Sequence, residues 1–209
     1  MRISTTTLES FRLFKDPAND WFKEEELIAT IKGVFVPTPA VLLGQAFGRI
    51  VESPEQFQVA QGYRYGDYTF SHQTMAPVFQ LIDRRGVFEA KAVKAYGDCD
   101  VVACADHLLG AQLSEFKTTS STFNFEKYAD SCQWRFMADI FQPLVITYRV
   151  FELDDHGNTV VEVKNISSFN LYPYAELHQD CCDLLAEFRD YVRAKRLDGL
   201  LRDRQRAAA

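Results

Sequence analysis

The chain has 209 residues, of which 47% are hydrophobic and 13% aromatic. This length and composition suit one domain over residues 1–209, with its core at about 40–165. No run of about 18 apolar residues and no signal-peptide pattern is present, so the sequence predicts no membrane span and favours a cytoplasmic location. The formal charge of −6 argues against non-specific coating of duplex DNA, but it allows an enzyme with acidic metal ligands.

The cysteines and histidines do not form a recognisable ligand pattern. Cys99, Cys104, Cys132, Cys181 and Cys182 contain no C-x-x-C pair with ligand spacing to a histidine or a second pair. The four histidines are scattered along the chain, and a lone histidine is more often structural than a ligand. We therefore predict neither a disulfide framework nor a zinc site.

The N-terminal part of the chain is predicted to be helical. Over residues 1–35, apolar residues recur at three- and four-residue intervals, and Gly33 closes this region. A second helix is predicted over residues 39–52, where the apolar stripe has helical period and Pro54 follows. Between residues 53 and 86 the pattern is weaker, and tyrosines around Gly66-Asp67 are compatible with a short hairpin or a mobile loop.

The second half of the chain predicts alternating strands and helices. Three consecutive antiparallel strands are expected at 87–95, 100–107 and 112–118, followed by one helix over 124–141. A strand pair at 145–152 and 159–165 flanks a turn-rich linker at 154–158, and a helix is expected from about 175 to 206. The resulting order is helix, three strands, helix, strand.

One predicted hairpin places three ionisable residues together. Glycine in the first position of a two-residue Gly110-Ala111 loop suits a type II′ turn, which puts Asp106 opposite Glu115. Opposed residues project to the same face with their Cβ atoms about 5 Å apart. Lys117 lies on that face by the period of two, while Phe116 points to the other face.

Two carboxylates this close repel each other unless a cation or a proton lies between them. Oxygen ligands favour Mg²⁺ or Mn²⁺ over zinc, and the ion would activate water for attack on a phosphodiester. In that chemistry Lys117 orients the water or stabilises charge in the transition state. The alternative is a solvated sheet face with an ordinary ion pair.

The same residues resemble a known family. Asp106, the run Glu115-Phe116-Lys117-Thr118-Thr119 and a helix with Gln133 are similar to the PD-(D/E)XK nuclease superfamily, above all its RecB-type and phage recombination exonuclease branch. Met137 stands where the family often has Tyr, and Tyr128 lies one turn earlier. The resemblance implies an α/β (α+β) fold with a restriction-endonuclease-like core, a mixed central sheet in αβββαβ order flanked by helices, and additional N- and C-terminal helices.

The resemblance extends to the predicted helix at 39–52. Gly44, Gly48 and Glu52 are spaced by four residues and share one helical face. The family often has a histidine at the position of Gly48, or a glutamate that completes the metal site. Glu52 is therefore a candidate third ligand, and the alternative is a solvent-facing acid at a helix end.

Further residues are candidate contacts with nucleic acid. Gln133 would steady the site or touch DNA, and Thr118 and Thr119 would bind a phosphate oxygen. Arg64 would stack on an exposed base, and Tyr128 is a further candidate contact with nucleic acid. The alternatives are a polar residue at a helix boundary, a plain strand end, and aromatic packing. A basic run over 189–206 would follow a DNA backbone or form a solvated helix. Because no cysteine precedes Cys99, no iron–sulfur cluster of the kind some relatives hold is expected.

The resemblance implies a magnesium-dependent DNA exonuclease that acts on duplex ends in phage or mobile-element recombination. It also implies a homo-oligomer, a single-strand annealing or recombination partner, and the host cytoplasm as the location of a phage-encoded protein. Two alternatives stay open at this point. One is an endonuclease of restriction or repair type on the same fold, and the other is an acidic DNA-mimic or interaction protein that does not hydrolyse DNA.

Overall fold

The computed structural model describes residues 1–34, 36–155 and 159–200. The helices are α1 (Thr5–Lys15), α2 (Glu24–Lys32), α3 (Pro39–Glu52), α4 (Pro54–Phe57), α5 (His72–Gln80), α6 (Phe125–Ala129), α7 (Cys132–Phe141) and α8 (Leu177–Ala194), with a 3₁₀ turn at Pro17–Asn19. The strands are β1 (Arg2–Ser4), β2 (Gln58–Val59), β3 (Gly62–Tyr65), β4 (Tyr68–Ser71), β5 (Val87–Tyr96), β6 (Cys99–Leu109), β7 (Gln112–Thr119), β8 (Val145–Asp154) and β9 (Val160–Leu171). No helix in these ranges is long and apolar enough to cross a membrane.

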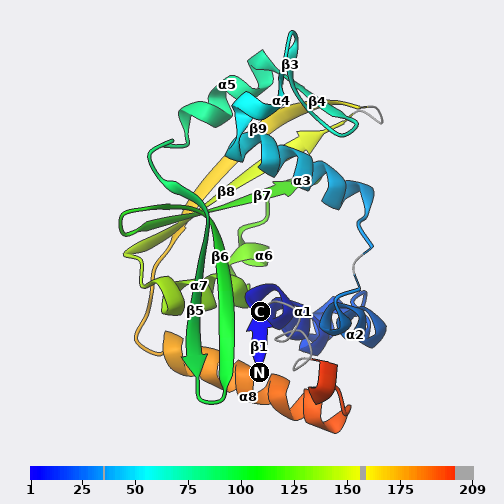
Figure 1. Cartoon of the computed structure of the whole chain (residues 1–209), viewed down its shortest axis with the longest axis vertical. Coiled ribbons are helices and arrows are strands. Elements are labelled where there is room, and N and C mark those ends of the chain that lie inside the picture. The colour runs from blue at the N-terminus through cyan, green and yellow to red at the C-terminus, as the bar shows by residue number, and fades with distance from the viewer. Residues whose placement is uncertain (35, 156–158, 201–209) are drawn as a thin grey trace.

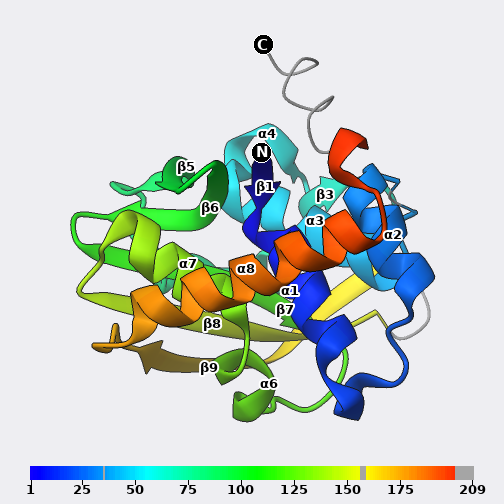
Figure 2. The same ribbon diagram turned by 90° about the horizontal axis from the view of Figure 1, so that it is seen from below.

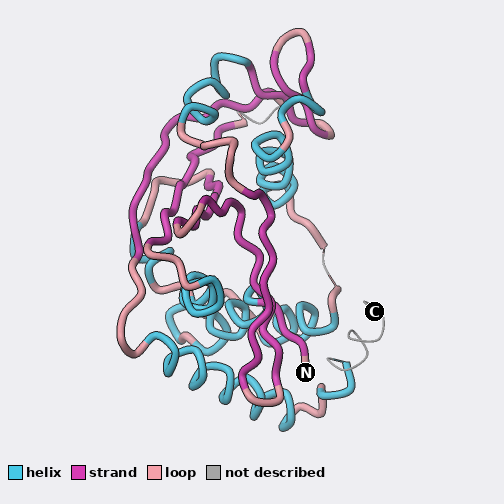
Figure 3. The backbone as a smooth tube through the Cα atoms, turned by 60° about the vertical axis from the view of Figure 1, so that its left-hand side comes forward, coloured by secondary structure: helices cyan, strands magenta, loops and turns pink. Residues whose placement is uncertain are grey.

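The described strands form one mixed sheet (Figure 1). Its order is β1-β6-β7-β8-β9-β4-β3-β2, and β5 pairs with β6 outside this path. The β1–β6, β7–β8 and β4–β9 pairs are parallel, and the others are antiparallel. Figure 3 shows β5 and β6 as a long two-stranded ribbon. The mixed central sheet flanked by helices confirms the predicted fold class.

Two hydrophobic cores cover the two faces of the sheet. Alternate residues of β8 separate them, because Tyr148 and Val150 belong to one core while Phe151 and Leu153 belong to the other. Helices α1, α7 and α8 pack on the first face, where Figure 2 shows them together, and α3 and α5 pack on the second. The site described below lies between these two layers of helices.

Several predicted elements are confirmed because strong local signals fix their ends. Helix α3 has the predicted bounds, since the Thr38 side chain caps it and Pro39 occupies its first turn. Gly33 ends α2 in the left-handed conformation at φ +74°. The tyrosine-rich segment forms the β3–β4 hairpin, with Tyr65 paired to Tyr68. The three strands β5 to β7 lie within two residues of their predicted bounds.

Two predictions about helices are wrong, and two elements were missed. The single helix over 124–141 is broken into α6 and α7, because the Ser131 side chain caps a new helix by accepting the N–H of Gln133. The C-terminal helix α8 ends at Ala194, and Arg196 adopts φ +56° beyond it. Strand β1 and helix α5 were not predicted. The turn at 156–158 and the basic residues at 201–206 lie outside the described residues.

Candidate active site

The candidate site lies where β6 and β7 separate. The predicted turn is present, with Gly110 at φ +58° and Leu109 paired to Gln112. Pairing continues to His107 and Ser114 and stops one step before Asp106 and Glu115. There, the backbone N–H of Phe116 donates instead to Asp106 Oδ2 at 2.6 Å. The Asp106 side chain therefore joins the two strands at the point where the backbone ladder opens.

Lys117 connects β7 to α7. Its Nζ donates to Glu115 Oε1 at 2.6 Å and to Gln133 Oε1 at 3.1 Å. The Glu115 side chain is 2% exposed, whereas that of Lys117 is 29% exposed. The structure thus brings together four residues that the sequence selected, namely Asp106, Glu115, Lys117 and Gln133.

Burial and mutual repulsion control the charges of this group. Burial and the nearby Glu115 carboxylate raise the pKa of Asp106 to about 8, although Lys117 and the Phe116 N–H act in the opposite direction. Burial alone would lower the pKa of Lys117, but the Glu115 and Asp106 carboxylates outweigh it and raise that pKa. Lys117 is consequently a charged donor, and Asp106 releases its proton less readily than an ordinary aspartate.

The residues fit a hard divalent cation. Glu115 Oε2 is buried and has no hydrogen-bond partner among the described residues, so one carboxylate oxygen remains available beside Asp106. Within the same described ranges, no three His, Cys, Asp or Glu side chains converge as a complete ligand set. Mg²⁺ suits such a site, because it is often bound through one or two carboxylates and takes its other ligands from water and substrate phosphate.

A cavity of about 650 Å³ opens beside Asp106 and Lys117, under α3. Gly44, Gly48 and Glu52 line one wall, as their spacing predicted. A Cβ atom on Gly44 would lie 2.8 Å from Thr118 Oγ1, whereas one on Gly48 would meet nothing within 4 Å. Gly44 therefore permits close packing of α3 on β7, and Gly48 leaves space in the cavity.

Glu52 shares this cavity but is already paired. Its Oε2 accepts from Arg49 at 3.0 Å. It does not join Asp106 and Glu115 in a group of three possible ligands among the described residues. Its role as a metal ligand stays a prediction.

The other predicted contacts with nucleic acid lie in different places. Thr118 lines the cavity, but Thr119 bonds through Oγ1 to Ser121. Tyr128 is 8% exposed and stacks on Phe123 in the first core, so it does not offer a surface to DNA. Arg64 is exposed in β3 and donates to Gly66 O, and it is not among the residues that line this cavity.

Sequence reasoning missed several residues that line the cavity, including Tyr65 and Glu89. Tyr65, the neighbour of Arg64, lines it in place of that arginine. Glu89 also lines it, in a backbone conformation of φ +51° that is rare for glutamate. Phe88 pairs with His107 and Ala90 with Ala105, so the register skips Glu89 opposite Asp106. A regular strand pattern gives no signal of this irregularity.

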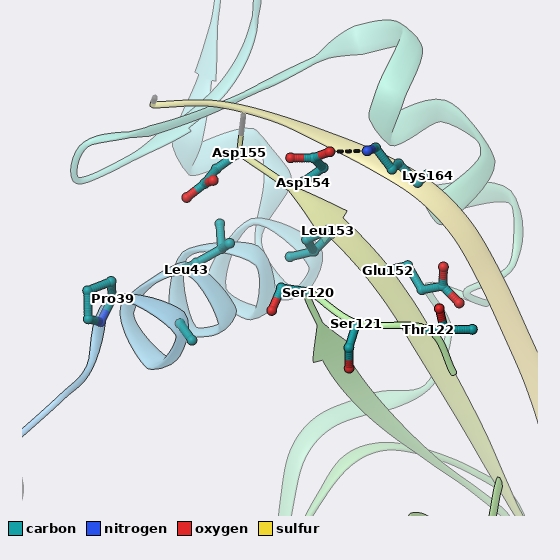
Figure 4. Close-up of a pocket in the computed structure, with 11 residues that line it drawn as sticks. Pro39, Leu43, Ser120, Ser121, Thr122, Glu152, Leu153, Asp154, Asp155 and Lys164 are labelled. Atoms are coloured by element: carbon teal, nitrogen blue, oxygen red, sulfur yellow. Dashed lines mark ion pairs between the residues drawn. The ribbon is translucent and has the colours of Figure 1, made fainter. Parts of the chain in front are cut away.

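A second cavity of about 490 Å³ lies at the N-terminal end of α3 (Figure 4). The hydroxyl-bearing residues 120–122 line it together with Glu152, Asp154 and Asp155. Asp154 forms an ion pair with Lys164 there. Three carboxylate residues line each of the two cavities, but the cavity beside Asp106 is also lined by two cationic residues, Arg49 and Lys117, whereas Lys164 is the cationic residue that lines the second cavity. The cavity beside Asp106 is therefore the better candidate for chemistry on nucleic acid.

Comparisons with known proteins agree with this fold. No protein-family model matches the chain, and no curated protein matches its sequence. The structure is similar to the alkaline exonuclease LHK-Exo from Laribacter hongkongensis, with a TM-score of 0.50, 10% identity, and coverage of 95% of this chain and 93% of that chain.

Two further solved structures are similar. LHK-Exo in complex with dAMP matches with a TM-score of 0.50 and 11% identity, over 94% of this chain and 92% of that chain. A candidate exonuclease from Eubacterium rectale matches with a TM-score of 0.52 and 10% identity, over 92% and 80% of the two chains. At these identities the similarity shows the fold, so the chain has the fold of these exonucleases.

Proposed function

We propose that the protein is a metal-dependent nuclease, and specifically a magnesium-dependent DNA exonuclease. The observation that carries this proposal is the convergence of Asp106, Glu115 and Lys117 beside a large cavity, with Glu115 Oε2 unpartnered among the described residues. The exonuclease fold supports the same conclusion. The PD-(D/E)XK resemblance of the sequence, which rests on the same residues, agrees with it.

Each residue has a distinct role in the proposed reaction. Asp106 and Glu115 hold Mg²⁺ or Mn²⁺, which when bound polarises the scissile phosphate and lowers the pKa of water. Lys117 keeps its proton and donates it as a hydrogen bond to developing negative charge. Gln133 accepts a hydrogen bond from Lys117 and so helps to fix the position of the ammonium group.

The proposed substrate is DNA, which the enzyme would degrade from a duplex end. LHK-Exo binds dAMP, and its similarity over most of both chains supports a nucleotide-binding role for the equivalent part of this fold. Of the two threonines predicted to bind phosphate, Thr118 lines the cavity, so its hydroxyl group is the candidate phosphate contact. A role in phage recombination, a homo-oligomer, an annealing partner and a cytoplasmic location stay predictions from the sequence.

A cleavage assay tests the proposal. We expect purified protein to release nucleotides from linear duplex DNA when magnesium is present and to stop when it is chelated. Lys117→Ala should lower kcat at least about 100-fold, because a preorganised donor to the transition state is lost. Lys15→Ala is the matched control, since Lys15 lies on α1 and pairs with Glu187. It should cleave at the parental rate.

The outcomes separate the alternatives. An exonuclease leaves closed circular DNA intact, whereas cutting of that circle would indicate the endonuclease on the same fold. No metal-dependent cleavage of either substrate, or full activity of Lys117→Ala, would refute the catalytic assignment. The non-catalytic DNA-mimic alternative predicts partner binding that survives Asp106→Asn.

A further inference from the structure

Tyr148 carries a buried hydroxyl group that nothing in the described structure uses. The residue is 0% exposed, and its Oη has no hydrogen-bond partner among the described residues. A buried polar atom without a partner reduces stability, and native structures contain few of them. The hydroxyl group does not stabilise the fold, so its presence at this position needs another explanation.

Packing does not require this hydroxyl. The Tyr148 ring stacks on Phe169 with ring centroids 5.3 Å apart, and it also contacts Tyr128 at 6.0 Å. These contacts use the aromatic faces, which phenylalanine also has. Phenylalanine at this position would keep the same core packing without burying a polar atom.

The position of Tyr148 connects it to the candidate site. In the parallel β7–β8 pair, Tyr148 is the register partner of Glu115. The two side chains therefore project to the same face of the sheet. Glu115 Oε2 is itself buried without a partner in the described part of the chain. One unused donor and one unused acceptor thus lie at paired positions.

The Tyr148 hydroxyl can act as a donor, because a tyrosine side chain keeps its proton at neutral pH. Lys117 occupies Glu115 Oε1 and Gln133 with two of its three N–H groups, so it holds one oxygen of the carboxylate and leaves the other.

We propose that Tyr148 is a positioning residue of this site, whose hydroxyl donates a hydrogen bond to the Glu115 carboxylate when that carboxylate holds a divalent cation. The inference rests on the proposed nuclease function. Carboxylates that bind metals are usually fixed by hydrogen bonds from residues behind them, and loss of such a partner typically lowers metal affinity 10- to 100-fold. Lys117 holds Glu115 from one side, and Tyr148 holds it from the neighbouring strand.

The test compares Tyr148→Phe with Tyr96→Phe in the full chain. Tyr96 is a matched control because it is also buried, but its hydroxyl already donates to Asp139 at 2.5 Å, outside the site. Mn²⁺ affinity is measured by calorimetry, the melting temperature is measured in chelator, and kcat and KM are measured on linear duplex.

Tyr148→Phe should weaken Mn²⁺ binding about 10-fold and lower kcat with KM for DNA unchanged, yet raise the metal-free Tm by about 2–4 °C. Tyr96→Phe should lower Tm and leave Mn²⁺ affinity unchanged. If the parent binds Mn²⁺ and cleaves DNA but Tyr148→Phe binds Mn²⁺ equally well, the positioning role is wrong and the nuclease assignment stands. A fall in Tm for Tyr148→Phe also overturns it, because that indicates a structural role. A parent without Mn²⁺ binding overturns both proposals.

Discussion

At the scale of single residues, ionisation of Asp106 is unfavourable in the folded, metal-free protein. Its carboxyl group is held between β6 and β7 by the Phe116 N–H, yet burial and Glu115 raise its pKa to about 8. An ordinary aspartate has a pKa of about 3.9 in an unfolded chain. The folded protein therefore retains a proton on Asp106 over a pH range in which the unfolded chain has released it.

This difference predicts a pH-dependent stability. Because the folded pKa is raised, the contribution of Asp106 is most favourable below about pH 4 and is lost as pH rises to about 8. In chelator, Asp106→Asn should thus become more stable relative to the parent between pH 5 and pH 8. Free energies of unfolding from urea titrations of both proteins give this comparison. Parallel stability curves for the two proteins over this range would contradict it.

The residues of the site differ in how far the sequence could predict them. The sequence could predict Asp106, Glu115 and Lys117, because the glycine of the Gly110-Ala111 turn fixes the register of one hairpin. Tyr148 was not, since its place beside Glu115 depends on the parallel pairing of β7 with β8, which residue spacing does not encode. Long-range pairing is invisible in local periodicity.

At the scale of elements, α3 contains two glycines with opposite environments. Gly44 faces Thr118 Oγ1 at a distance that leaves no room for a methyl group, whereas Gly48 faces open space in the cavity. Alanine is better than glycine in a helix interior by up to about 1 kcal/mol. Only at Gly48 can that gain be realised without displacing a neighbour.

Gly48→Ala should therefore raise the free energy of unfolding by about 0.5–1 kcal/mol. Gly44→Ala should be clearly less stable than Gly48→Ala, because its methyl group must displace the stiff Thr118 side chain. Chemical denaturation of the two single variants beside the parent measures both effects. Equal stabilisation by the two substitutions would show that α3 does not pack on β7 as closely as described.

The elements that the sequence missed depend on tertiary contacts. The break between α6 and α7 is fixed by Glu9 of α1, whose Oε2 accepts from Ser131 Oγ at 2.9 Å and from the Cys132 N–H at 2.7 Å. Strand β1 is three residues long and exists through its parallel pairing with β6. Helix α5 contains Pro77, which is unfavourable inside a helix.

At the scale of the whole molecule, the sheet forks at β6, because one edge of this strand pairs with two different strands. The same edge of β6 pairs with β1 at Asp100–Val102 and with β7 at His107–Leu109. Between these two stretches, Asp106 is free of the backbone ladder on that edge and reaches β7 with its side chain. Alternate side chains of β8 belong to the cores on the two faces of the sheet. Helices therefore pack on both faces and reach the fork from both sides. The sequence predicted the order of β5, β6, β7 and β8, but the fork depends on how separate segments pair.

The central claim is that Asp106 and Glu115 together hold a divalent cation beside Lys117. A crystal structure of the protein soaked in Mn²⁺, with anomalous diffraction measured near the manganese edge, tests this claim most directly. We predict an anomalous peak between the Asp106 and Glu115 carboxylates that disappears in Glu115→Gln crystals. Crystals at saturating Mn²⁺ that show no peak between these two residues, from protein that cleaves DNA in the same buffer, would contradict the account.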